Sequence, residues 1–264
     1  PDISNIFFSE LARGVDDIAT MYKYNIILSN SDQNKEKELR LINNMFEKQV
    51  DGLIYMGAGI TDEHVQQFKT SSVPVALAAT LDPTDAIPSV NIDYEKAAYE
   101  ATTLLIENGT KHPIYVSEKG DSPVNERKLS GFKKAIEDAN QELNEDYIIH
   151  TNLSYKAGEE AAKQIVEMGN YPKAIFTASD ELALGIIHGL QDEGVQVPND
   201  VEVVGFDNTR LATMVRPTLT TVVQPMYDIG AVAMRLLTKF MNKETVDDQN
   251  VILPHQIMRR NSTK

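Results

Sequence analysis

The sequence predicts an α/β fold built from two parallel-sheet, Rossmann-like subdomains, and three observations support this. At 264 residues the chain exceeds the usual length of one domain, about 100–200 residues. Short β-rich runs alternate with amphipathic helical runs, which is the pattern of right-handed βα units in parallel sheets. A turn-rich stretch at residues 82–88 divides this alternation into two series.

The first series alternates helices and strands from its start. Apolar residues at helical spacing, such as Leu11, Val15 and Ile18, predict an opening helix, and the run NIILSN predicts a buried strand. The expected helices cover residues 9–22, 35–48 and 61–70, and the expected strands 25–30, 52–56 and 74–78.

A strand expected at 89–92 leads out of the first series and into the second. Asp93 follows this strand and is placed to cap the next helix. The expected helices cover 94–107, 125–139, 156–168 and 181–193, and the expected strands 114–117, 147–150, 174–178 and 201–206. A strand at 219–223, a long helix at 226–242 and short strands at 251–253 and 256–258 complete the chain.

The first series opens with the tail of a strand at Pro1 and lacks closing elements, so we expect the long helix to return to it. This gives an N-subdomain of residues 1–92 plus 224–254 and a C-subdomain of residues 93–223 plus 255–264. Three crossings, near residues 90–95, 220–225 and 253–257, would form a hinge around a cleft.

Composition excludes several classes of protein. No cysteine is present, which excludes disulfides and thiolate metal sites, and no apolar segment is long enough to cross a membrane. The start carries no secretory signal, so we expect a cytoplasmic location. The net charge of −14 opposes a phosphate backbone, so this part alone should not hold DNA.

The motifs of common enzymes are also missing. The five histidines are far apart and form no HExxH pattern, so we expect no metal or other cofactor. The stretch Gly57-Ala58-Gly59 reads as a plain βα turn, because Asp62 stands where a dinucleotide fingerprint needs glycine. Neither a phosphate-binding P-loop nor a G-x-S-x-G elbow occurs, and we predict no enzymatic activity.

Residues at strand ends and helix starts are candidates for a ligand cleft, because parallel sheets bind ligands at the carboxyl ends of their strands. The candidate effector residues are Phe7, Phe8, Arg127, Ser179, Asp180 and Asp207. For each of them a structural role is the alternative to ligand binding: helix capping for Ser179-Asp180, a turn for Asp207, a solvated surface position for Arg127 and a core position for Phe7 and Phe8.

The helix at 226–242 carries an unusual polar strip beside its apolar stripe. An aromatic ring, an acid, a small residue and two cations recur there at spacings of three and four: Tyr227, Asp228, Ala231, Arg235 and Lys239. In a chain of net charge −14, this pair of cations is a plausible receptor for a phosphoryl group on a docking protein. A solvated face of mixed charge is the alternative.

Several runs of the sequence resemble the core of the LacI/GalR family of bacterial repressors. They are PDISN with Phe7-Phe8 and LARG near the start, QVDGLI at 49–54, and above all the run from Gly205 to Lys239, GFDNTRLATMVRPTLTTVVQPMYDIGAVAMRLLTK. The resemblance implies a periplasmic-binding-protein-like core with three crossovers, a homodimer, and DNA binding only through an N-terminal helix-turn-helix domain that this chain lacks.

The resemblance also implies a role in carbon catabolite repression. The corepressor it implies is HPr phosphorylated on serine, or the paralogue Crh, with glucose 6-phosphate and fructose 1,6-bisphosphate as effectors in the cleft. The corepressor contacts it implies are Asp16, Tyr227, Asp228, Ala231, Val232, Arg235, Leu236 and Lys239, with Arg235 and Lys239 as phosphoserine ligands. The alternatives are a sugar-binding solute receptor and a sugar-phosphate enzyme.

Overall fold

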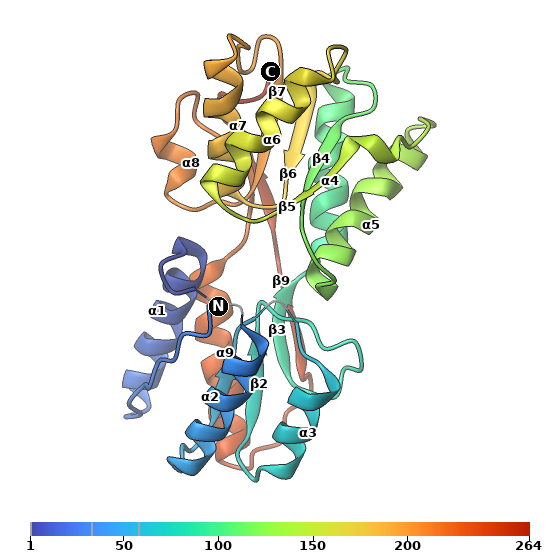
Figure 1. Cartoon of the computed structure of the whole chain (residues 1–264). Helices are drawn as coiled ribbons and strands as arrows, with labels where there is room; N and C mark the ends of the chain where they lie inside the picture. The colour runs from blue at the N-terminus through green and yellow to red at the C-terminus, as the bar shows by residue number, and fades with distance from the viewer. Residues whose placement is uncertain (1, 33, 58) are drawn as a thin grey trace. The chain divides into compact units, whose positions relative to one another are not determined.

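The computed structural model describes residues 2–32, 34–57 and 59–264. The chain forms two compact units. The first consists of Pro1–Ile92, Ser122–Val124 and Pro225–Pro254, and the second of Asp93–Asp121, Asn125–Gln224 and His255–Lys264. Each unit combines helices with a sheet of mostly parallel strands (Figure 1), so the predicted fold class is confirmed.

The first unit contains a four-stranded parallel sheet in the order β1-β2-β3-β9. Its strands are β1 (Leu53–Tyr55), β2 (Val75–Ala78), β3 (Ser89–Ile92) and β9 (Asn250–Leu253). Its helices are α1 (Ile6–Met21), α2 (Lys35–Glu47), α3 (Asp62–Thr70) and α9 (Met226–Met241). The predicted elements therefore form within a few residues of their expected bounds, with one exception.

The exception is the strand predicted at residues 25–30, which is wrong for this structure. These residues adopt no regular structure, and none of their backbone groups pairs with a strand among the described residues. A run rich in β-branched residues becomes a strand only when a neighbour pairs with it. Here the nearest strand of the sheet, β1, is paired only with β2.

Helices α1 and α9 cross in close contact because each carries a glycine at the crossing. A Cβ atom on Gly14 would lie 2.0 Å from the carbonyl oxygen of Tyr227, and one on Gly230 would lie 2.0 Å from that of Leu11. Asn5 begins α1, where its side chain accepts a hydrogen bond from the backbone N–H of Phe7. The two helices form one continuous surface of the first unit.

The second unit contains a six-stranded sheet in the order β10-β8-β7-β6-β4-β5, in which only β10 is antiparallel. Its strands are β4 (Ile114–Glu118), β5 (Ile148–Thr151), β6 (Ala174–Thr177), β7 (Glu202–Asp207), β8 (Thr220–Val223) and β10 (Gln256–Met258). Its helices are α4 (Tyr94–Glu107), α5 (Pro123–Asp138), η1 (Glu145–Tyr147), α6 (Tyr155–Glu167), α7 (Asp180–Asp192) and α8 (Leu211–Met214).

The chain order of the second sheet reverses at β4, which lies between β5 and β6. A parallel sheet binds ligands at the carboxyl ends of its strands near such a reversal. Three rings pack within the sheet's core, where Tyr115 lies 5.3 Å from Phe132 and 5.0 Å from Phe176. In the described part of the chain, no helix combines the length and the apolar character needed to span a bilayer.

Candidate functional site

The outer face of α9 presents a regular strip of accessible side chains. Asp228, Arg235 and Lys239 are exposed and Val232 is half-buried, and these four positions follow one another at spacings of four, three and four residues. They therefore lie on one side of the helix. The opposite side packs into the first unit through Ile229, Ala233 and Leu237.

Helix α1 extends this strip across the close crossing. The hydroxyl of Tyr227 donates a hydrogen bond to Asp17 at 2.9 Å, and this bond to a carboxylate raises the pKa of the Tyr227 phenol. Asp16, next to Asp17, is exposed. The exposed positions of both helices thus bring an aromatic ring, carboxylates and cations together in what we call the α1–α9 surface: Asp16, Asp17, Tyr227, Asp228, Val232, Arg235 and Lys239.

Two other residues of the predicted corepressor site lie beneath this surface. Ala231 and Leu236 are each 6% exposed, so they support the surface rather than form it. Ala231 also borders the crossing, since its backbone nitrogen lies 3.0 Å from a Cβ built on Gly14.

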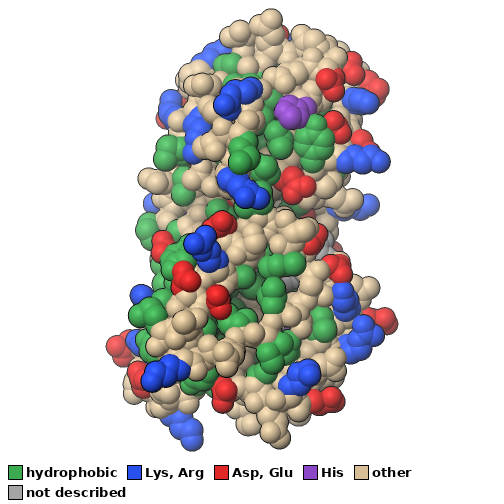
Figure 2. Space-filling model, turned by 90° about the vertical axis from the view of Figure 1, so that its left-hand side faces the viewer, with side chains coloured by type: hydrophobic (Ala, Val, Ile, Leu, Met, Phe, Trp, Pro, Cys, Tyr) green, Lys and Arg blue, Asp and Glu red, His purple; other side chains and the backbone are tan. Residues whose placement is uncertain are grey.

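Among the described residues, the cations of the α1–α9 surface have no acidic partner. Across residues 2–32, 34–57 and 59–264, neither Arg235 nor Lys239 forms an ion pair or a hydrogen bond through its side chain. Figure 2 faces the side on which α1 lies in Figure 1 and shows acidic and basic side chains among hydrophobic ones there. Both cations are available to an anionic partner.

A second group of charged residues lies at the carboxyl ends of β4, β6 and β7. The amine of Lys128 is buried, donates a hydrogen bond to the carbonyl oxygen of Ala178 at 3.0 Å and lies 3.9 Å from the centre of the Phe206 ring. Burial lowers its pKa, against the attraction of Asp207 and Glu118. We call Glu118, Lys128, Asp180 and Asp207 the strand-end cluster.

The carboxyl groups of this cluster are held in different ways. Asp180 accepts hydrogen bonds from the backbone N–H and hydroxyl of Thr209 and from the hydroxyl of Thr221. Asp207 accepts one from the Gln224 amide at 2.7 Å and has a φ of +111°, an unusual conformation for a residue with a side chain. Burial raises the pKa of Asp180 to about 7 and that of Asp207 to about 8.

The strand-end cluster contains only some of the predicted effector residues. Asp180 and Asp207 belong to it, whereas Ser179 caps α7 by accepting a hydrogen bond from the N–H of Leu182. The side chain of Arg127 is 65% exposed and lies 3.7 Å from Glu95. In the first unit, Phe7 is buried, Phe8 is half-buried, and their rings meet edge to face at 5.0 Å.

Sequence reasoning missed Lys128, although a signal for it existed. The buried positions of α5 include Asn125, Lys128, Gly131 and Phe132, which are three or four residues apart. A lysine on the apolar stripe of a helix must find a partner for its charge inside the protein.

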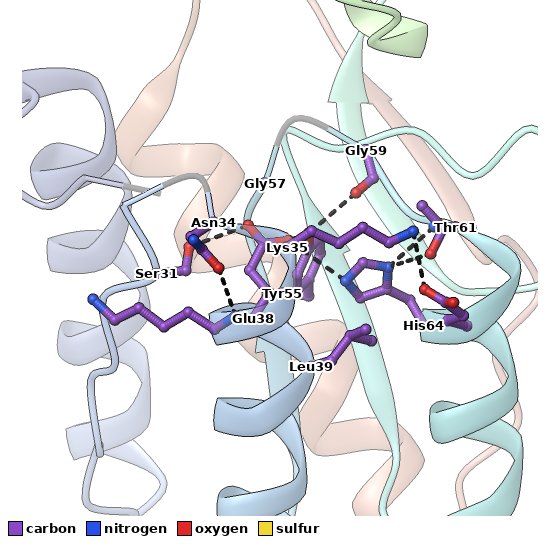
Figure 3. Close-up of polar contacts among 12 residues, drawn as sticks. Ser31, Asn34, Lys35, Glu38, Leu39, Tyr55, Gly57, Gly59, Thr61 and His64 are labelled. Carbon is purple, nitrogen blue, oxygen red and sulfur yellow. Dashed lines mark hydrogen bonds and ion pairs between the residues drawn. The ribbon is translucent and has the colours of Figure 1, made fainter.

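A third polar group joins α2, β1 and α3 in the first unit (Figure 3). Glu38 lies 3.1 Å from the hydroxyls of both Ser31 and Tyr55, and 3.5 Å from Nε2 of the buried His64. Nδ1 of His64 accepts a hydrogen bond from the backbone N–H of Thr61, which places the ring proton on Nε2, toward Glu38. Burial raises the pKa of Glu38, but these hydrogen bonds outweigh it and leave that pKa lowered.

This third group ties helices to a strand and accounts for His64 as a core histidine. In the part of the chain that the structure describes, no three His, Cys, Asp or Glu side chains are placed to hold a metal ion. Of the predicted turn Gly57-Ala58-Gly59, Ala58 lies outside the described residues, and Gly57 exchanges hydrogen bonds with the hydroxyl of the buried Thr80.

Comparison with known proteins shows the family to which the chain belongs. Residues 102–263 match the model of the periplasmic binding protein-like domain. Catabolite control protein A of Priestia megaterium is 58% identical over 265 residues, which cover 100% of this chain and 80% of that protein. Catabolite control protein A of Staphylococcus xylosus is 49% identical, with the same coverage.

A solved structure agrees with these relatives. The transcription regulator CcpA of Lactococcus lactis superposes with a TM-score of 0.95 at 42% identity, and the match covers 100% of this chain and 97% of that one. These proteins are named as regulators rather than as enzymes. The chain therefore belongs to the LacI-type transcription regulators with a periplasmic-binding-protein-like core, within the group of catabolite control protein A.

Proposed function

We propose that the α1–α9 surface binds a corepressor protein phosphorylated on serine, HPr or its paralogue Crh, and so raises the affinity of the dimeric regulator for operator DNA. The observation that carries this proposal is the pair of exposed cations, Arg235 and Lys239, without an intramolecular partner in the described chain. A phosphoserine carries close to two negative charges near neutral pH and several acceptor oxygens, so it suits two adjacent cations.

The remaining residues of the surface would orient the bound partner protein. Asp16 and Asp228 would pair with basic residues of the docking protein, while Tyr227 and Val232 offer apolar contact between the charges. A chain of net charge −14 repels most acidic proteins. Recognition then depends on the phosphoryl group meeting the two cations, with the acids excluding partners that lack basic residues.

Isothermal titration calorimetry with HPr in its serine-phosphorylated and unphosphorylated forms tests this proposal. We expect the phosphorylated form to bind at least about 100-fold more tightly, since two charge-assisted contacts contribute about 1.5–3 kcal/mol each. Arg235→Ala should remove most of that preference.

The matched control is Arg40→Ala, which removes an exposed cation from α2 in the same unit but outside the surface. It should leave both affinities unchanged. Equal affinity for the two forms of HPr, or an equal loss in both variants, would sink the proposed phosphoserine site.

We also propose that glucose 6-phosphate and fructose 1,6-bisphosphate act as effectors at the strand-end cluster. Three carboxyl groups surround one amine there, so the cluster suits the hydroxyl groups of a sugar better than its phosphate. Titration with each sugar phosphate should show weaker binding to Asp207→Asn than to the wild type. An unchanged affinity would remove Asp207 from the effector site.

A further inference from the structure

The turn that follows β7 has an unusual backbone at two successive residues. The φ of Asp207 is +111° and that of Asn208 is +58°, although neither residue is a glycine. Residues with a side chain adopt a positive φ at a cost, so the surrounding contacts must hold them there. Because Asp207 ends β7 and belongs to the strand-end cluster, the conformation of this turn sets the position of its carboxyl group.

Side chains from two other elements hold the next two residues of the turn. The Asp180 carboxylate, at the start of α7, accepts hydrogen bonds from the backbone N–H of Thr209 at 2.6 Å and from its hydroxyl at 3.0 Å. The Arg260 guanidinium, which follows β10, donates to the side-chain oxygen of Asn208 at 2.7 Å. Its other terminal nitrogen donates to the carbonyl oxygen of Leu219 at 2.8 Å. Arg260 therefore bridges the turn and the residue that precedes β8.

Gln224 holds Asp207 itself and leaves one acceptor free. Its side-chain nitrogen donates to the Asp207 carboxylate at 2.7 Å, and its backbone N–H donates to the Asp207 carbonyl oxygen at 3.2 Å. Its side-chain oxygen has no hydrogen-bond partner among the described residues, although Gln224 is only 4% exposed. A buried acceptor without a partner is costly, and a hydroxyl group of a ligand would satisfy it. This free acceptor indicates a ligand position beside Asp207.

We propose that Arg260 is a positioning residue of the effector site: it holds Asn208 and thereby keeps the Asp207 carboxyl group near Lys128. The inference rests on the proposed effector function of the strand-end cluster. Within the described chain the guanidinium forms no ion pair, and its hydrogen bonds go to uncharged oxygens. An arginine suits this role because its planar group donates in two fixed directions at once.

The segment that carries Arg260 is held in place without the guanidinium. The backbone N–H of Arg260 donates to the Thr220 hydroxyl at 2.8 Å, and this hydroxyl lies 3.1 Å from the Arg260 carbonyl oxygen. The Ser262 hydroxyl donates to the Val203 carbonyl oxygen at 2.6 Å and accepts from the N–H of Thr220 at 2.8 Å. These contacts fix the segment against β7 and β8, so we expect a variant without the guanidinium to fold.

Replacing Arg260 by methionine separates positioning from charge, because the two predict opposite changes in the pKa of Asp207. Burial raises that pKa to about 8, so a carboxyl group released from the cluster into water should have a lower pKa. Loss of a nearby positive charge alone would raise it. We expect Arg260→Met to lower the pKa of Asp207 by at least about 1. The titratable groups around Asp207 are unchanged in this variant: Tyr94, Glu118, Lys128 and Asp180.

The measurement is an NMR pH titration of chains with isotope-labelled aspartate, in which Asp207→Asn identifies the Asp207 signal. Arg259→Ala is the matched control, since Arg259 is exposed and its loss removes the same charge one residue away. This control should leave the pKa of Asp207 unchanged. An unchanged or raised pKa of Asp207 in Arg260→Met would overturn the proposal.

Asn208→Gly supplies a second variant that keeps the arginine. It removes the acceptor that Arg260 uses, and glycine adopts the positive φ without strain. It should lower the pKa of Asp207 as Arg260→Met does, and the double variant should lower it no further, because both changes break the same contact. Additive effects of the two substitutions would show that Arg260 does not act through Asn208.

Calorimetric titration with glucose 6-phosphate relates the turn to the effector function. Arg260→Met should bind it at least about 10-fold more weakly, whereas Arg259→Ala should bind it as the wild type does. Wild-type affinity in Arg260→Met would remove Arg260 from the effector site. If the wild type does not bind glucose 6-phosphate but Arg260→Met still lowers the pKa of Asp207, the effector function is wrong and the positioning of Asp207 by Arg260 stands.

Discussion

Replacing Gly14 by alanine tests whether close helix packing builds the α1–α9 surface. The added Cβ would lie 2.0 Å from the carbonyl oxygen of Tyr227, whereas real Cβ contacts essentially never fall under 3.0 Å. Both groups belong to helices, and the oxygen is backbone, so no side chain can rotate away. The helices must separate by about 1 Å to relieve the overlap.

Two effects of opposite sign set the magnitude. Overpacking of a closely packed interior typically costs about 1–3 kcal/mol, while alanine in place of glycine favours the helix by about 1 kcal/mol. Because the overlap is severe and the oxygen belongs to the backbone, the overpacking cost lies near the upper end of that range, about 2–3 kcal/mol, and we expect a net loss of about 1–2 kcal/mol for Gly14→Ala. In urea unfolding followed by circular dichroism, this lowers the midpoint by roughly 0.5–1 M, since the slope of unfolding is near 2 kcal/mol per M.

Two further variants make the result specific to the crossing. Thr20→Ala, at an exposed position of the same helix, gains propensity without a clash and should raise the midpoint slightly. The double variant Gly14→Ala/Gly230→Ala should lose less than the sum of the single losses, because the first separation relieves the second overlap. A Gly14→Ala chain as stable as the wild type would refute the close crossing.

Three other predictions concern single polar residues. The first is Asp180→Asn, measured by urea unfolding at pH 4 and at pH 8. The folded-state pKa of Asp180 near 7 makes the wild type lose stability as pH rises, whereas the amide does not titrate, so the free energy of unfolding of the variant relative to the wild type should rise by about 2–4 kcal/mol between the two pH values. A difference that stays constant with pH contradicts this. Asp82→Ala removes a carboxylate that accepts three backbone hydrogen bonds and should lose about 2–3 kcal/mol at pH 7. Burial raises the pKa of Asp82, but these hydrogen bonds outweigh burial and leave the pKa lowered. The loss of stability in Asp82→Ala should therefore shrink below about pH 4, where the wild-type carboxylate becomes protonated. A loss that grows in acid would contradict this prediction. Tyr227→Phe removes an exposed hydrogen bond to Asp17 and should leave the thermal unfolding temperature unchanged, whereas a large drop would make that bond structural.

The sequence predicts most of the fold because most elements carry their own signals. Asp93 caps α4 through the N–H of Lys96 as its position suggests, and the apolar stripe of α9 packs on the first unit. The strand at 25–30 has an equally strong pattern, yet it fails to form. Helices satisfy their hydrogen bonds internally, whereas a strand depends on a neighbour that its own residues cannot specify.

The candidate sites also depend partly on signals in neighbouring residues and partly on contacts between residues far apart in the sequence. Arg127 and Lys128 are adjacent in sequence, but neighbouring positions on a helix point about 100° apart, so one is exposed and the other buried. Residue type favours the arginine as an anion ligand, while periodicity places the lysine on the inner stripe with Asn125 and Phe132. Burial decides which of the two cations belongs to the candidate site, because the buried Lys128 lies near the carboxylate of Asp207. Asp207 follows about 80 residues later in the sequence, at the end of β7. A ligand site in a parallel sheet is therefore read from the buried polar positions that follow its strands, and the identity of a charged residue alone is a weaker guide.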